Sequence, residues 1–120
     1  MTSIFIVEDE PTLRSIYTEL LTNYGITVIG SAKDGEEAIK MFKSFKKKPD
    51  FIIMDHRMPL KDGIQTMKEI LQIDKTSKII FASADRSIEE VALTKGAIAF
   101  LLKPFRIKML INLIKKKSFL

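Results

Sequence analysis

The 120-residue sequence contains no cysteine, only one histidine, and no apolar run approaching the roughly 20 residues that a membrane-spanning helix needs. Without cysteine there is neither a disulfide framework nor a thiolate metal site. This suits the cytoplasm, where we expect the protein, without a membrane partner. The first apolar segment, residues 4–7, runs straight into Glu8-Asp9-Glu10, so it is not a signal peptide.

Hydrophobic residues make up 46% of the chain and charged residues 29%, which is typical of a folded globular protein. The length predicts a single domain over residues 1–120. The net charge is +5, and the lysines gather in residues 46–48 and 115–117, at the ends of predicted helices, where cations are favoured. Neither run is interleaved with aromatic residues or placed on a DNA-reading motif, so we expect no direct nucleic-acid binding.

Short apolar runs alternate with segments whose apolar residues recur every three or four positions. The short runs predict buried strands over residues 3–7, 26–30, 51–54, 78–82 and 97–102. The recurring positions predict helices with apolar faces made of Leu13, Ile16, Tyr17, Leu20, Leu21 and Tyr24; Ala38, Ile39, Phe42 and Phe45; Ile64, Met67, Ile70 and Leu71; Ile88, Val91 and Ala92; and Ile107, Leu110, Ile111 and Ile114. The signals for turns and helix ends are Pro11, Gly25, Asp34, Pro49, Pro59, Gly63 and Gly96. Strict alternation predicts an α/β fold with a doubly wound parallel sheet and helices on both faces.

Polar residues follow four of the predicted strands. In such sheets ligands bind beyond the carboxyl ends of the strands, where this sequence places Glu8 and Asp9, Asp55, Ser83 and Lys103. Three neighbouring carboxylates repel one another unless a cation lies among them, and oxygen ligands suit a hard ion such as Mg²⁺. A metal there would neutralise charge as a phosphoryl group approaches a carboxylate. The lysine ammonium and the serine hydroxyl would reach the phosphoryl oxygens.

Four segments match a known family, in order along the chain. They are Ile6-Val7-Glu8-Asp9-Glu10, Met54-Asp55-His56-Arg57-Met58-Pro59 with Asp62-Gly63, Ala82-Ser83-Ala84, and Phe100-Leu101-Leu102-Lys103-Pro104-Phe105. Each alone is a weak signal, because an acidic pair also caps helices and Lys-Pro also makes turns. Together they make essentially the whole sequence resemble the CheY-like response-regulator receiver domains of two-component signalling. The resemblance implies a flavodoxin-like, three-layer fold with a five-stranded parallel sheet of order 2-1-3-4-5 and five helices.

The resemblance also implies a metal site and an acceptor. Asp55 would accept a phosphoryl group in a Mg²⁺-dependent reaction. Asp9 would ligate the metal directly, Glu8 through a bound water, and Arg57 through its backbone carbonyl, with Asp55 completing the set. Such a protein is a switch that assists its own phosphorylation and dephosphorylation, not an enzyme for external substrates.

The remaining motif residues match the family's switch. Lys103 would contact the phosphoryl group, with its bond to Pro104 cis, and Ser83 and Phe100 match the hydroxyl–aromatic switch pair. In the family the hydroxyl moves toward the phosphoryl group and the ring turns inward, which reshapes the surface of the fourth helix, fifth strand and fifth helix. The implied partners are a sensor histidine kinase or phosphotransfer protein in a phosphorelay, and a downstream protein target. A phosphorylation-dependent homodimer through the same surface is a further hypothesis.

Several positions near the site vary in the family or depart from its commonest pattern. Ser83 stands where threonine is frequent, which preserves the hydroxyl, and Phe100 stands where tyrosine is also common, which removes the phenol. We expect Arg57 either to shield the phosphoryl group from water or to pair with Asp85. The single histidine, His56, directly follows the acceptor, but adjacent side chains that leave a strand point oppositely, so we expect it to face away.

Three other interpretations stay open. A flavodoxin-like FMN protein shares the architecture, but Glu8-Asp9-Glu10 would repel a phosphate. A phosphohydrolase with an aspartyl nucleophile carries a second aspartate where Arg57 stands here. A non-phosphorylated flavodoxin-like protein-interaction module would usually lack the acceptor or metal acids, which are all present. Residues 118–120 end either a stand-alone receiver or a piece cut from a longer regulator.

Overall fold

Five parallel strands form one sheet in the order β2-β1-β3-β4-β5. The computed structural model describes residues 2–58 and 61–118, and the predicted loop residue Pro59 lies outside that part. The strands are β1 (Ser3–Val7), β2 (Thr27–Ala32), β3 (Phe51–Asp55), β4 (Ile79–Ser83) and β5 (Ala99–Leu102). The predicted doubly wound sheet and its strand order are confirmed.

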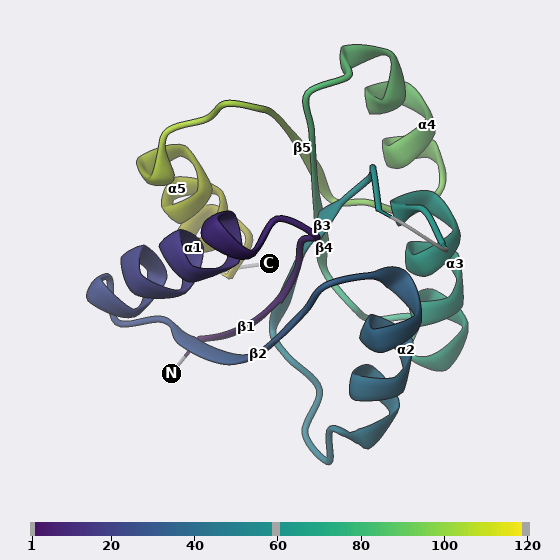
Figure 1. Ribbon diagram of the computed structural model, residues 1–120, viewed down its shortest axis with the longest axis horizontal. Coiled ribbons are helices and arrows are strands. Elements are labelled where there is room, and N and C mark those ends of the chain that lie inside the picture. Colours follow the sequence, from purple (N-terminus) through teal and green to yellow (C-terminus); the bar gives the residue numbers. More distant parts are fainter. Residues whose placement is uncertain (1, 59–60, 119–120) are drawn as a thin grey trace.

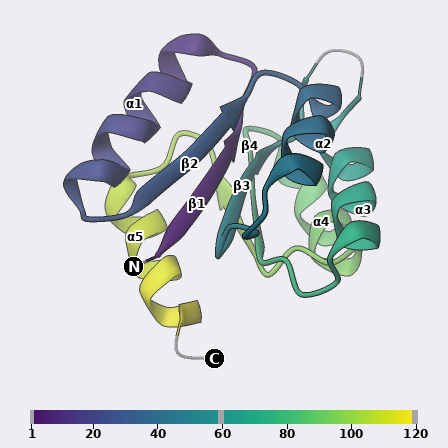
Figure 2. The same ribbon diagram turned by 90° about the horizontal axis from the view of Figure 1, so that it is seen from below.

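Helices cover both faces of the sheet (Figures 1 and 2). One face carries α1 (Pro11–Asn23) and α5 (Ile107–Ser118). The other carries α2 (Gly35–Ser44), α3 (Gly63–Ile73) and α4 (Glu89–Thr94), the last preceded by the 3₁₀ turn η1 (Arg86–Ile88). The result is the three-layer arrangement that strict alternation of strands and helices predicts.

The two layers of core follow from the alternation of side chains along each strand. In β1, Ile4 and Ile6 pack under α1 and α5, whereas Phe5 and Val7 pack under α2, α3 and α4. Every residue of β3 and of β4 is buried. A strand buried on both faces needs apolar residues at consecutive positions, which explains why these strands appear in the sequence as continuous apolar runs.

Some predicted boundaries and faces were wrong. Tyr24 does not extend the apolar face of α1, because it is the residue that ends the helix and is 45% exposed; Ile16 is 42% exposed as well. Gly25 and Gly96 adopt φ of 81° and 123°, which favours glycine at the turns after α1 and α4. β2 extends two residues beyond its predicted end because Ala32 pairs with Val7.

The lysine runs lie at helix ends, as predicted. Lys48 Nζ donates hydrogen bonds to the carbonyls of Phe42 (2.5 Å) and Phe45 (3.0 Å), at the carboxyl end of α2. Residues 115–117 form the last turn of α5. Within residues 2–58 and 61–118, no helix is both long and apolar enough to cross a membrane.

Candidate functional site

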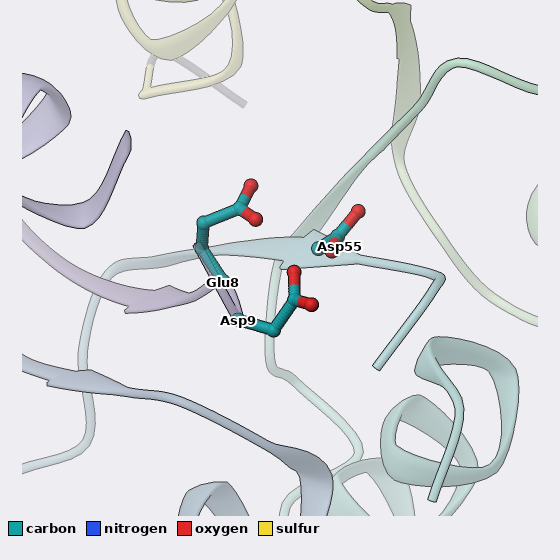
Figure 3. Close-up of side chains that lie close together, drawn as sticks. All are labelled: Glu8, Asp9 and Asp55. Carbon is teal, nitrogen blue, oxygen red and sulfur yellow. The ribbon is translucent and has the colours of Figure 1, made fainter. Parts of the chain in front are cut away.

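The carboxyl ends of the strands bring three acids together. Asp55 is the last residue of β3, and Glu8 and Asp9 directly follow β1, which lies beside β3. Figure 3 shows their side chains gathered at this edge, and one carboxylate oxygen from each lies within 4.8 Å of the others. Glu8 and Asp55 are 3% and 7% exposed, whereas Asp9 is exposed to solvent. Burying carboxylates so close together is unfavourable unless a positive charge compensates them.

Lys103 supplies that charge from the far end of the sheet. Its Nζ lies 2.5 Å from Glu8 Oε1 and 3.2 Å from Asp55 Oδ1. Its backbone N–H donates to the carbonyl of Ser83 at 2.8 Å, which fixes the end of β5 against β4. Burial favours the neutral amine, but the hydrogen bond to Glu8 and the charges of both acids outweigh it and raise the pKa of Lys103. The ammonium is therefore fully charged at neutral pH.

The electrostatics of Asp55 differ from those of an ordinary carboxylate. Burial raises its pKa to about 7, against the opposing effect of the Lys103 ammonium, with further increases from Glu8 and Asp9. A single lysine thus does not compensate three acids, and a second cation would lower the pKa of Asp55. The atoms that the three acids offer to a metal are all carboxylate oxygens, which are the ligands that Mg²⁺ prefers, so the residues fit Mg²⁺.

The loop that carries the two N-terminal acids is held by Arg14, which the sequence reasoning missed. Arg14 Nη1 donates hydrogen bonds to the carbonyls of Glu8 (2.9 Å) and Asp9 (3.1 Å) from one turn inside α1. The N–H of Glu10 donates to Glu8 Oε2 at 3.2 Å. Helix α1 therefore fixes the acids in place before any ligand arrives. An arginine shortly after an acidic pair is the only sequence signal for this contact, and it is weak.

The Asp62-Gly63 motif has a structural role behind Asp55. The side chain of Asp62 accepts a hydrogen bond from the N–H of Gln65 at 2.9 Å and so caps α3. The N–H of Gly63 donates to the carbonyl of His56 at 2.9 Å, which closes the loop that leaves β3. These bonds set the direction of the chain immediately after the acid.

The two residues predicted to form a switch pair lie on neighbouring strands. Ser83 is 2% exposed, and its Oγ accepts a hydrogen bond from the N–H of Asp85 at 3.0 Å. Phe100 is half-buried and packs against the core under α2, α3 and α4. Neither residue is in contact with Asp55 through a hydrogen bond or ion pair in the described ranges.

The residues that flank the acid lie as follows. Arg57 Nη2 is 3.8 Å from Asp85 Oδ2, which is the predicted pair. The ring of His56 lies against Phe81, with centroids 5.8 Å apart, and makes no hydrogen bond to Asp55 in the part of the chain that the structure describes. The Lys103–Pro104 peptide bond is cis, as the resemblance implies.

Known proteins are similar to this chain in sequence and in fold. The response regulator receiver domain family matches residues 4–115. The chain is 35% identical over 117 residues to the chemotaxis protein CheY of Thermotoga maritima, covering 96% of both chains. It is 32% identical to the probable C4-dicarboxylate response regulator DctR of Bacillus subtilis, covering 94% of this chain but half of that protein's length. A chain in the crystal structure of the CheX–CheY–BeF₃–Mg²⁺ complex from Borrelia burgdorferi superposes with a TM-score of 0.89 at 30% identity, covering 99% of this chain and 90% of that one. The family match over most of the chain and the identity to these relatives place this chain in the response-regulator receiver domain family.

Proposed function

We propose that Asp55 accepts a phosphoryl group from the phosphohistidine of a sensor histidine kinase or phosphotransfer protein. A carboxylate oxygen forms the new P–O bond as the P–N bond to the donor imidazole breaks, and the imidazole takes up a proton. The observation that carries the proposal is the position of Asp55 between two further acids and the Lys103 ammonium. Phosphoryl transfer needs positioning and charge compensation more than covalent help from the protein, and this site is built to supply both.

The proposed metal ligands are the carboxylates of Asp9 and Asp55 and the backbone carbonyl of Arg57, with Glu8 acting through water. Both oxygens of Glu8 already accept hydrogen bonds, from Lys103 and from the N–H of Glu10, which supports an indirect role. Asp9 is exposed and open to a ligand. A bound Mg²⁺ supplies compensation for the charge of the incoming phosphoryl oxygens. The crystal structure of the Borrelia complex contains both Mg²⁺ and BeF₃, which supports the same use here.

Lys103 and Ser83 are the proposed contacts for the phosphoryl oxygens. The lysine ammonium already touches the acceptor carboxylate, and a small movement would turn it toward a group bound there. Ser83 would exchange its hydrogen bond from the Asp85 N–H for one to the phosphoryl group. Ser83 and Phe81 lie two residues apart on β4, and Phe81 pairs with Phe100 of β5. A shift of Ser83 would therefore reach Phe100 through the adjacent strands.

The proposed output surface comprises α4, β5 and α5. It exposes three large apolar side chains, Val91 (44%), Leu93 (42%) and Met109 (53%), which are available to a partner. Charged residues around them are plausible contacts for a target, namely Glu89, Glu90, Lys95, Arg106 and Lys108. We propose a downstream protein as the partner of this surface, in the cytoplasm. A second copy of the chain is the other candidate, and an unchanged monomer mass after phosphorylation would exclude it.

Intact-protein mass spectrometry after incubation with phosphoramidate tests the proposal. A single Mg²⁺-dependent phosphoryl adduct is expected on the wild type and should be lost in Asp55→Asn. Asp62→Asn is the matched control, because Asp62 caps α3 outside the acidic cluster, and it should keep the adduct. No adduct on a wild-type protein that binds Mg²⁺ would favour an interaction module. Steady release of phosphate from an external ester would favour a hydrolase.

A further inference from the structure

Tyr17 lies between α1 and the segment that follows Lys103. Its side chain belongs to the buried core under α1 and α5 and is 9% exposed. Its ring stacks on that of Phe105, with centroids 5.7 Å apart and planes 17° from parallel. Both rings border a cavity of about 310 Å³, which Lys103 and Pro104 also line. The tyrosine therefore contacts the chain two residues beyond the lysine and shares a cavity wall with it.

The phenol is also within electrostatic range of the site. Burial raises the pKa of Tyr17, the Lys103 ammonium opposes that rise, and the carboxylates of Glu8 and Asp55 add to it. The ammonium and the two buried carboxylates of the site thus act on the phenol. The sequence predicted Tyr17 only as part of an apolar helix face. Its place beside Lys103 results from the way the chain folds.

The segment that carries Lys103 has two anchors. On one side, the N–H of Lys103 is bound to the carbonyl of Ser83 at 2.8 Å. On the other side, the chain passes through Pro104 to Phe105, whose half-buried ring rests on Tyr17. A lysine side chain has four rotatable bonds, so the position of its ammonium depends on how well its backbone and its walls are fixed.

We propose that Tyr17 is a positioning residue that holds Lys103 over Asp55 by stacking on Phe105. The inference rests on the proposed role of Lys103 in phosphoryl transfer. It predicts that the aromatic ring matters and the hydroxyl does not. Loss of the ring would enlarge the cavity beside Lys103 and free the segment of residues 103–106.

Four variants test this. Tyr17→Leu and Phe105→Leu each remove one ring of the stack, whereas Tyr17→Phe keeps both. Leu21→Val is the matched control for a loss of packing, because Leu21 lies one turn further along α1, is wholly buried and is not part of the wall around Lys103. In the metal-free protein, backbone ¹⁵N relaxation should show increased motion of the amides of residues 103, 105 and 106 in the two leucine variants alone.

The second measurement is the rate of phosphorylation by phosphoramidate at saturating Mg²⁺. The two leucine variants should be slower by about tenfold, less than the roughly 100-fold that a misplacement of a catalytic group by about 1 Å can cost, with Mg²⁺ affinity unchanged. The phosphorylation rates of Tyr17→Phe and Leu21→Val should stay within about twofold of the wild-type rate, because neither variant disturbs the stack beside the lysine. In a Lys103→Met background, Tyr17→Leu should cause no further loss, because its effect passes through the lysine.

The proposal would be overturned if Tyr17→Leu slowed phosphorylation in the Lys103→Met background as much as it does in the wild type. Leucine variants that behave like the wild type in both measurements would also overturn it. If Tyr17→Leu does not fold, Phe105→Leu carries the same test. A wild type without a phosphoryl adduct would refute the proposed function, but the relaxation experiment would still decide whether Tyr17 orders the lysine segment.

Discussion

Gly63 lies against the backbone of Asp55 so closely that a Cβ at residue 63 would overlap the Asp55 carbonyl oxygen. The same Cβ would approach His56 Cα to 2.8 Å and the ring of Phe81 to 2.9 Å. Because two of these neighbours are backbone atoms of the loop that leaves β3, they cannot turn aside. We predict that Gly63→Ala lowers the free energy of unfolding by about 2–3 kcal/mol, measured by urea denaturation.

Gly30→Ala is the control for that variant. A Cβ there would meet the end of the Met41 side chain at 2.9 Å and Phe45 Cζ at 3.3 Å, and flexible side-chain atoms can move. Its cost should be clearly smaller. Equal costs for the two substitutions would show that the contact behind Asp55 has no special rigidity.

Removing the lysine ammonium should destabilise the fold in a pH-dependent way. Lys103→Met leaves Glu8 and Asp55 buried without their cation, which should cost about 3 kcal/mol or more at pH 8. At pH 6 the cost should be smaller, because a carboxyl group can take up a proton instead. Urea denaturation at both pH values measures the difference. Lys108→Met, an exposed lysine on α5, should change stability little at either pH.

The raised pKa of Asp55 predicts that the metal-free wild type loses stability as pH rises. The ordinary pKa of this carboxyl is 3.8, and the folded value is about 7. Between pH 3.8 and about 7 the folded protein holds a proton that the unfolded chain has released. Raising the pH through this range therefore lowers the free energy of unfolding. Urea denaturation in EDTA should give a lower free energy of unfolding at pH 7.5 than at pH 5.5 for the wild type. The difference should be smaller for Asp55→Asn. A wild type whose stability rises over this range would contradict the prediction.

Bound Mg²⁺ should offset the loss of stability with rising pH. Binding requires the ionised carboxylate, so affinity should rise with pH up to about 7 and level off above it. Calorimetric titrations in buffers of different ionisation enthalpy would detect the released proton.

Arg57 should influence the lifetime of the phosphoryl group without influencing stability. Its side chain is 78% exposed and lies 3.8 Å from Asp85, so solvent screens the pair and its loss should leave the free energy of unfolding almost unchanged. If Arg57 shields the phosphoryl group from water, Arg57→Ala should speed dephosphorylation with no change in unfolding. Asp85→Ala breaks the same pair but keeps the arginine, which separates shielding from pairing. Unchanged dephosphorylation in Arg57→Ala would refute the shielding hypothesis.

The architecture and the strand-end residues could be predicted because they depend on local patterns. Strands buried on both faces must be continuously apolar, and Gly25 and Gly96 mark turns that other residues adopt with strain. Once the strands are parallel, their carboxyl ends share one edge, and β1 lies beside β3, so Glu8 and Asp55 come together. Lys103 follows β5, two strands away from β3, and reaches Asp55 through the length of its side chain. The strand order was implied by the resemblance to the receiver family and not by the alternation of elements.

The rest depends on three-dimensional contacts that leave no periodic signal. Arg14 reaches backbone carbonyls, which every residue has, so nothing in the sequence singles out its targets. The stack of Tyr17 on Phe105 joins residues from opposite ends of the chain. The exposure of Ile16 was missed because an apolar pattern does not reveal how far round a helix its neighbours extend.

The ion pair of Lys103 joins the two ends of the sequence. The lysine is 95 residues from Glu8 and 48 from Asp55, and β5, which precedes it, is an edge strand. A chain that emerges from the ribosome amino end first therefore displays its acids long before it displays their counterion. Until the edge strand has docked, the acids lack the ammonium that offsets their mutual repulsion. The acceptor therefore gains its compensating ammonium only when the last strand of the sheet is in place.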